Sequence, residues 1–530
     1  MRLPTLVATA GLAAVLFAPF SSGVAAPAPD FHLLEATIGD VRAALASGQL
    51  TCRALVDAYI KRIQAYDTSG PKLNAVQTFN PHALEEADRL DAAMKASGPV
   101  GPLHCVPVLL KDEVETSDMP TTYGSAVFKD FIPQRDATIV TKLKKAGAII
   151  VAKTNMGEFA RSYVGSAFGV TRNPYDPTRN PSGSSGGTGS GVAANYALIG
   201  IGEDTGGSIR GPAAVASLVG LRPTVPLVSR FGMMPSRPTQ DTLGPIARTV
   251  TDAAILLDTI AGYDPDDPIT AAAVGQVPPS YTAFLTADGL KGARIGIIRE
   301  PMDPAADPSS EDYKKVHAVV DRAIADLKRL GAEITDSVGI GDLKLRIKTM
   351  YDDDVYETEE ATNLYLKDHP GAPAKTLRDI LLSGKLIPQR AKALMDNIGK
   401  STNDAGYLRV LNAKEQTRQQ ILKIMADNRL DALVYATFDH QPTVIAPDVL
   451  TNPDTKDEYA RGQNRYLAPL LGFPALTVPG GFTSDGLPVG IEFLGRAFSE
   501  GTLLKLGYAF EQGTQHRKPP ASTPALSGEP

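Results

Sequence analysis

The spacing of hydrophobic residues predicts alternating helices and strands in the first part of the chain. Apolar side chains recur at helical spacing in residues 38–66 and 83–96. Two short apolar runs without that period, 106–110 and 147–152, predict buried strands, and a helix is expected over 137–145 between them. Such alternation is typical of an α/β protein, in which helices cover the faces of one sheet.

The alternation returns near the C-terminus after a long helical stretch. Residues 294–298 predict a strand and 311–330 a helix. Residues 341–430 are charged, mostly helical in pattern and poor in glycine turns, so we expect a helical insertion that caps a cleft. Further strands are expected at 433–435, 475–478 and 486–494.

Composition narrows the function. The chain has 530 residues, of which 43% are hydrophobic and 21% charged, as in an ordinary globular protein. Its net charge is -6 and no lysine or arginine cluster stands out, which argues against a nucleic-acid partner. It has no tryptophan and few aromatic residues, which argues against a stacking platform for bases.

The two ends predict processing and disorder. Residues 1–26 combine an arginine, an apolar run and small residues before a cleavage point, which predicts a signal peptide and a secreted or periplasmic protein. No later segment has enough uninterrupted apolar residues to cross a bilayer, so we expect no membrane insertion of the mature chain. Residues 521–530, rich in proline and serine, predict a disordered tail.

Two cysteines, Cys52 and Cys105, allow one disulfide. In an exported protein they can be oxidised to a bridge, or they can remain two separate buried thiols. Both alternatives stay open at this point.

A lysine and two serines are the strongest candidates for chemistry. Lys111 follows the apolar run 106–110, and Ser184 and Ser208 lie in glycine-rich segments. A serine nucleophile needs a base, and a lysine can serve when burial lowers its pKa. We therefore expect a neutral Lys111 and activity that rises toward alkaline pH. The alternative is a surface lysine that pairs with its neighbour Asp112 or Glu113.

Other short motifs fit less well. Residues 183–187 match the nucleophile elbow with Ser185 as nucleophile, but residues 179–182 before it cannot form a central strand. Residues 204–206 match an aspartic-protease triplet, but the chain has no second copy. No phosphate loop and no metal-ligand spacing is found, so we expect no cofactor and no metal.

The chain resembles the amidase signature family over about residues 35 to 515. The matching segments are 107–112, 152–159, 183–191, 204–210, 472–481 and 486–490, and the C-terminal stretch 499–520 is similar to that of bacterial peptide amidases. The resemblance implies a single large α/β domain over 27–520, with a mixed sheet between helices on both faces. It also implies a hydrolase that cleaves carboxamide bonds to an acid and ammonia or an amine.

The resemblance also implies residue roles. Ser208 matches the nucleophile, Lys111 the base, and Ser184 a bridging serine held by a cis peptide. The matching oxyanion-hole donors are the backbone N–H groups of Thr205, Gly206, Gly207 and Ser208. Asp204 and Arg210 match residues that support this loop, and Gly211 departs from the larger residue that many relatives carry.

The substrate is predicted only by class. An apolar pocket suited to aryl or alkyl acyl groups is expected from Tyr123, Ser125, Met156, Phe159, Tyr163 and Phe438. The family resemblance leaves three substrates open: a peptide C-terminal amide, an aryl acylamide or a carbamate. It leaves two other classes of protein open as well, an A-type component of a tRNA-dependent amidotransferase and a non-catalytic binding protein.

Overall fold

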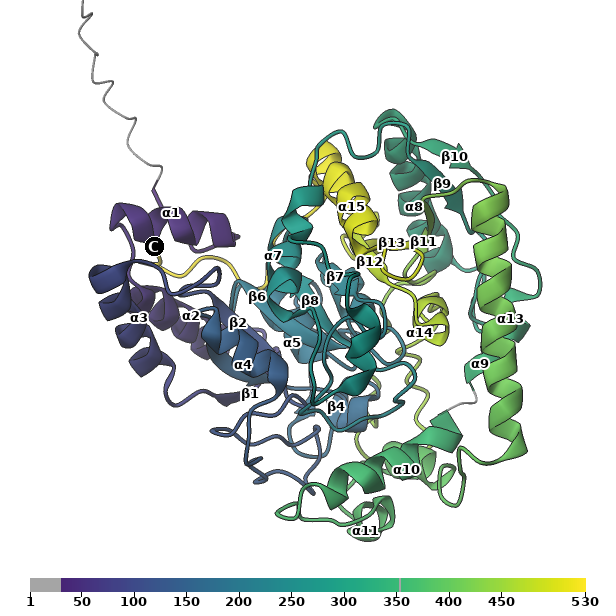
Figure 1. Ribbon diagram of the computed structural model, residues 1–530, viewed down its shortest axis with the longest axis horizontal. Helices are drawn as coiled ribbons and strands as arrows, with labels where there is room; N and C mark the ends of the chain where they lie inside the picture. Colours follow the sequence, from purple (N-terminus) through teal and green to yellow (C-terminus); the bar gives the residue numbers. More distant parts are fainter. Residues whose placement is uncertain (1–29, 352–353) are drawn as a thin grey trace, which may run out of the picture.

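One mixed sheet of eleven strands forms the centre of the protein, in a computed structural model that describes residues 30–351 and 354–530 (Figure 1). The signal peptide predicted for residues 1–26 lies outside the described residues. The strands, in their order across the sheet, are β1 (Val76–Phe79), β3 (Ile149–Thr154), β2 (Pro107–Lys111), β6 (Ile199–Glu203), β8 (Leu243–Ala247), β7 (Val219–Arg222), β12 (Ala475–Phe482), β13 (Pro488–Leu494), β11 (Ala432–Ala436), β9 (Arg294–Ile297) and β10 (Glu333–Thr335).

The sheet mixes parallel and antiparallel pairs. β2 lies parallel to both β3 and β6, whereas β6 and β8 are antiparallel. All five residues of β2 are buried, as expected of a strand covered on both faces, and this explains its continuous apolar sequence. The predicted α/β architecture is confirmed.

Helices cover both faces. The major helices outside the 341–430 region are α1 (Ile38–Ser47), α2 (Cys52–Tyr66), α3 (Ala83–Ser97), α4 (Thr138–Lys145), α5 (Gly186–Ala193), α6 (Arg210–Val215), α7 (Val250–Ile260), α8 (Glu311–Arg329), α14 (Leu467–Leu471) and α15 (Glu500–Thr514). On β2, Val108 and Leu110 pack in the core cluster with α1, α4 and α7, while Leu109 packs in the cluster with α5. Because strand residues alternate between faces, Lys111 shares the face of Leu109 and α5.

The helical pattern over 38–66 proves to be two helices. Gly48 ends α1 with a left-handed φ of 75°, and Thr51 begins α2 by accepting a hydrogen bond from the Ala54 N–H. Periodicity alone does not detect this break, because apolar residues continue on both sides of it. Among the described helices, none is long and apolar enough to cross a bilayer.

The described residues of 341–430 form five helices beside the sheet. These are α9 (Leu343–Tyr351), α10 (Asp354–Lys367), α11 (Leu377–Leu382), α12 (Pro388–Met395) and α13 (Ala405–Asp427). Figure 1 shows α10 and α11 at one end of the molecule and α13 along its side.

The C-terminal segment 521–530, expected to be disordered, packs against the domain instead. Glu529 pairs with the buried Arg62 at 2.7 Å, and the Thr523 carbonyl accepts a hydrogen bond from the same guanidinium at 2.8 Å. The Pro530 carbonyl accepts one from the Leu33 N–H at 2.7 Å. Composition did not predict this because the ordering group, Arg62, lies 461 residues from Thr523 in the chain.

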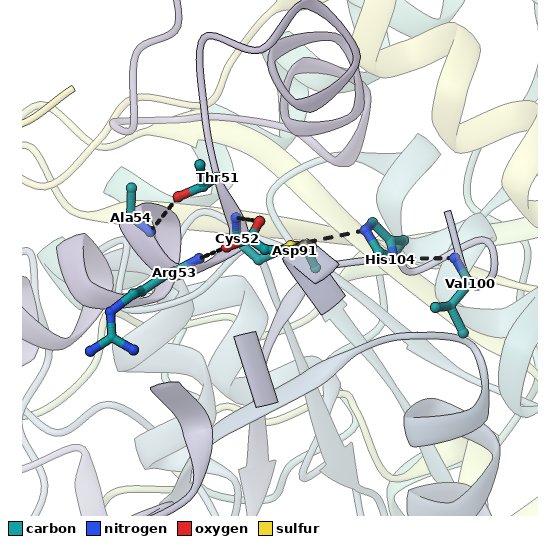
Figure 2. Close-up of a disulfide and its surroundings, with 8 residues drawn as sticks. Thr51, Cys52, Arg53, Ala54, Asp91, Val100 and His104 are labelled. Carbon is teal, nitrogen blue, oxygen red and sulfur yellow. Dashed lines mark hydrogen bonds between the residues drawn. A yellow bond between two sulfur atoms is a disulfide. The ribbon is translucent and has the colours of Figure 1, made fainter. Parts of the chain in front are cut away.

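Cys52 and Cys105 form a disulfide with a Cα–Cα distance of 5.2 Å. Figure 2 draws the bridge with Asp91 and His104 beside it; Asp91 accepts the Cys52 N–H at 2.7 Å. Of the described residues, Cys52, Cys105 and His104 bring three potential metal-ligand atoms within 4.8 Å of one another. Since the two sulfurs are bonded to each other, neither is a thiolate ligand in this state.

Candidate active site

Lys111 lies at the end of β2 with its ammonium group fully buried. Its Nζ lies 2.8 Å from Ser184 Oγ, the hydroxyl that the sequence places in the bridging position. The alternation along β2 explains this contact, because it turns the lysine toward the face where α5 begins. The alternative of a surface lysine is therefore wrong about the position, although the lysine does pair with Glu113 as that alternative expected.

The two serines lie on loops that lead into helices. Ser184 precedes α5 by two residues and follows a cis peptide bond at Gly183–Ser184, as the resemblance implied. Ser208 precedes α6 by two residues and is nearly buried. Ser208, Gly183 and Thr205 line the same small cavity of about 50 Å³.

Arg465 joins the two serine loops. Its Nη1 donates to the Gly183 carbonyl at 2.7 Å and to the Gly207 carbonyl at 3.2 Å. The close approach depends on Gly211, where an added Cβ would lie 2.3 Å from that same nitrogen. Glycine at position 211, where many relatives carry a larger residue, thus leaves the space that the Arg465 guanidinium occupies.

The backbone donors near Ser208 are only partly available. The Gly207 N–H already donates to Asp204 Oδ1 at 2.7 Å. Within the described part of the chain, the N–H groups of Thr205, Gly206 and Ser208 donate to no other group. Of the four predicted oxyanion donors, three are therefore available and Gly207 supports the loop instead; its φ of 102° is one that glycine adopts readily.

Asp204 and Arg210 lie beneath this loop. Asp204 accepts from the Ile209 N–H and from Arg210 Nε, both at 3.2 Å, and Arg222 donates to it at 2.9 Å. Burial opposes the charged form of Asp204, but Arg210 and Arg222 hold its pKa well below the ordinary value. A second carboxylate, Glu492, pairs with Arg210 from β13.

Two carboxyl groups flank the buried lysine. Glu113 Oε1 lies 2.7 Å and Glu203 Oε2 2.8 Å from Lys111 Nζ. Burial alone would lower the pKa of Lys111, but the attraction of these two groups outweighs it and raises the pKa. The expected depressed pKa is therefore wrong. The sequence did not reveal Glu203, because this residue, at the end of the neighbouring strand β6, is 92 residues away along the chain.

The expected pocket residues are only partly at the site. Phe159 lines the cavity with Ser208, and Tyr123 lines an adjoining cavity with Phe159. Four others are not in the wall of either cavity. Met156 is buried in the interior, Ser125 is buried near Glu158, Tyr163 packs against Tyr459, and Phe438 lies under Arg465.

The wall of the cavity is polar rather than apolar, in contrast to the expectation. Arg237, Arg390 and Arg465 line it, together with Tyr351 and Asn397. The Arg237 guanidinium lies 4.6 Å from the centre of the Tyr351 ring, and Arg390 donates to the Phe159 carbonyl at 2.8 Å. These residues come from the helical region and from loops without a motif, so local sequence gave no signal for them.

Comparison with known proteins identifies the relatives of this chain. Residues 54–504 match the family model described as amidase. A probable amidase of Arabidopsis thaliana is 34% identical, over 92% of each chain. The A-type component of the glutamyl-tRNA(Gln) amidotransferase of Desulfatibacillum aliphaticivorans is 36% identical, over 92% of this chain and 99% of the other. The crystal structure of the peptide amidase of Stenotrophomonas maltophilia has a TM-score of 0.81 and 35% identity, over 92% of this chain and 99% of that one.

Proposed function

The chain belongs to the amidase family and cleaves carboxamide C–N bonds, and we propose that Lys111, Ser184 and Ser208 carry out this cleavage through an acyl-enzyme. The observation that supports the proposal most is the 2.8 Å contact of the buried Lys111 Nζ with Ser184 Oγ, beside the cavity that Ser208 lines. The hydrogen bonds of the described residues include the Lys111–Ser184 contact but none between Ser184 Oγ and Ser208 Oγ, so the relay requires the Ser208 hydroxyl to turn toward Ser184.

The proposed reaction proceeds in two steps. Ser208 Oγ loses its proton through Ser184 to Lys111 and attacks the amide carbon, while the free N–H groups of Thr205, Gly206 and Ser208 stabilise the oxyanion. The proton passes back to the leaving nitrogen, and an ester to Ser208 remains. Water then attacks this ester by the same relay and releases the acid.

We propose a peptide C-terminal amide as the first substrate to test. The similarity to a solved peptide amidase supports this choice, and so does the polar cavity wall, which can accept hydrogen bonds from a peptide backbone and donate to it. Aryl acylamides and carbamates are the competing substrates. The similarity to the amidotransferase component supports one second function, ammonia release for a partner protein.

The test is a panel of peptide amide, anilide and carbamate substrates with the purified wild-type chain and with S208A. We expect release of ammonia from the peptide amide and a loss of at least about 1000-fold in kcat for S208A. A fluorophosphonate probe should label Ser208 in the wild type and not in S208A. Near-wild-type turnover by S208A would refute the assignment, and turnover only with added partner proteins would favour the amidotransferase.

We propose further that the protein is exported. The pattern of residues 1–26 supports this, as does the Cys52–Cys105 disulfide, since such bridges persist in oxidising compartments. N-terminal sequencing of the protein from a culture fraction would test it. An intact N-terminus in the cytoplasmic fraction would contradict export.

A further inference from the structure

The charge on Lys111 presents a problem for its role as a base. Its Nζ is held by two carboxyl groups, Glu113 at 2.7 Å and Glu203 at 2.8 Å, and all three side chains are buried. A lysine so placed is an ammonium ion at neutral pH, because the carboxylates favour its charged form. An ammonium ion has no lone pair with which to take the proton of Ser184.

We propose that Glu203 takes one proton from the Lys111 ammonium group and thereby frees Nζ as the base. The inference rests on the proposed function, since it explains how that triad works. The N–H bond of Nζ toward Glu203 breaks and an O–H bond at Oε2 forms. The ion pair becomes a neutral pair without any net movement of charge out of the site. Rotation about Cε–Nζ then turns the lone pair to Ser184.

A hydroxyl group identifies which carboxyl groups hold protons at rest. Thr205 Oγ1 lies 2.6 Å from Glu203 Oε1 and 2.7 Å from Asp241 Oδ1. A hydroxyl has one proton and can donate to only one of them, so the other must be protonated and donate to Thr205. Burial and the neighbouring Glu203 raise the pKa of Asp241 to about 7, which makes Asp241 the donor. Glu203 is then the charged acceptor of both Thr205 and Lys111.

Glu113 is the second buried carboxyl group at Lys111 Nζ. Burial, with the nearby Glu203, raises its pKa well above the ordinary value.

Among the described residues, Arg222 acts on Glu203, Lys153 on Glu113, and Arg230 on Asp241. All three are cations. Because they are positively charged, they oppose the uptake of a further proton by the carboxyl groups of the cluster.

The fully buried Lys153 shows what Lys111 would do without its carboxyl groups. Its nearest carboxylate oxygen, on Asp112, is 3.8 Å away, and burial lowers its pKa to about 8. In the double variant E113Q/E203Q, Lys111 would lose both close partners and should titrate at a similar pH. The ionisation of Lys111 itself would then determine the acid limb of the pH–rate profile, because Lys111 could no longer pass its proton to Glu203.

The experiment is the pH profile of kcat/KM on the peptide amide for the wild type and E113Q/E203Q. We expect the wild type to keep its plateau rate at about pH 7, whereas the double variant falls about tenfold below its own alkaline plateau there. The rate of fluorophosphonate labelling of Ser208 should show the same shift, which a purely structural role would not produce.

A matched control is E500Q. Glu500 is also buried and accepts the Thr224 N–H at 2.7 Å, but it lies outside the cluster, so its profile should be that of the wild type. An unshifted acid limb in E113Q/E203Q overturns the proposal. Should that variant not fold, the wild type alone decides: an acid limb at about pH 8 or above shows that Lys111 titrates by itself. Activity in S208A would instead contradict the proposed function.

Discussion

Removal of the Cys52–Cys105 disulfide is expected to destabilise the protein by a calculable amount. The bridge ties the start of α2 to the residues that lead into β2, the strand that ends at Lys111. In the variant C52A/C105A, the unfolded chain regains the freedom that the closed loop had removed. The folded state loses little, since both positions are small and buried.

The loop length gives the magnitude. The cysteines are separated by 53 residues in sequence. For a loop of this length, the chain-entropy relation gives a loss of about 4 kcal/mol in the free energy of unfolding. Divided by the unfolding entropy of roughly 500 ordered residues, this lowers Tm by about 4 °C.

Urea unfolding and calorimetry, with and without a reductant, measure this effect. The oxidised wild type should be more stable than both the reduced wild type and C52A/C105A, and reductant should not change C52A/C105A. A thiol-reactive dye should find no free thiol in the unfolded, unreduced protein. If two thiols react under those conditions, or if reductant leaves the wild-type midpoint unchanged, the reasoning is refuted.

Three more predictions concern the site and the tail. R465A removes the donor that joins Gly183 to Gly207, so the two catalytic serines should be misplaced and kcat should fall by about 100-fold in a steady-state assay. The control is R496A, which loses only a hydrogen bond to the distant Leu430 carbonyl and should keep the wild-type kcat. Because the pKa of Asp241 is raised to about 7, its contribution to stability is complete in acid and is lost as the pH rises toward and through 7. Between about pH 4 and 8, the free energy of unfolding measured in urea should therefore fall less for D241N than for the wild type, and the two falls should differ by up to roughly 4 kcal/mol. Equal falls would argue against a protonated Asp241. E529Q removes the anion paired with the buried Arg62 and should cost about 2 kcal/mol by the same measurement, whereas an unchanged midpoint would mean that the tail contributes nothing.

Local sequence predicted the elements that carry the site. The apolar run before Lys111 is a buried strand, and the glycine-rich segments around Ser184 and Ser208 are loops that lead into α5 and α6. Apolar periodicity and glycine content suffice here, because both features are decided by neighbours a few residues apart. The break at Gly48 was missed, since one residue with a left-handed backbone does not disturb the apolar pattern.

The pocket could not be predicted in this way. Met156 and Tyr163 are apolar and near the motifs in sequence, but they fill the interior rather than the cavity wall. Arg390 in α12 and Arg237 do line it, although nothing in their local sequence marks them. The wall of a cavity is formed by segments that meet only when the chain is folded, so spacing along the sequence carries no information about it.

By itself, the sequence determined the α/β class, the family and the identity of the three residues proposed to act on the amide. Only the tertiary structure decided the electrostatic state of the lysine. Glu203 reaches Lys111 because β6 pairs with β2 in parallel, and both strands end at the same edge of the sheet. A charge is stabilised or destabilised by what lies within a few ångströms of it in space, and that neighbourhood is created by strand pairing, not by order along the chain.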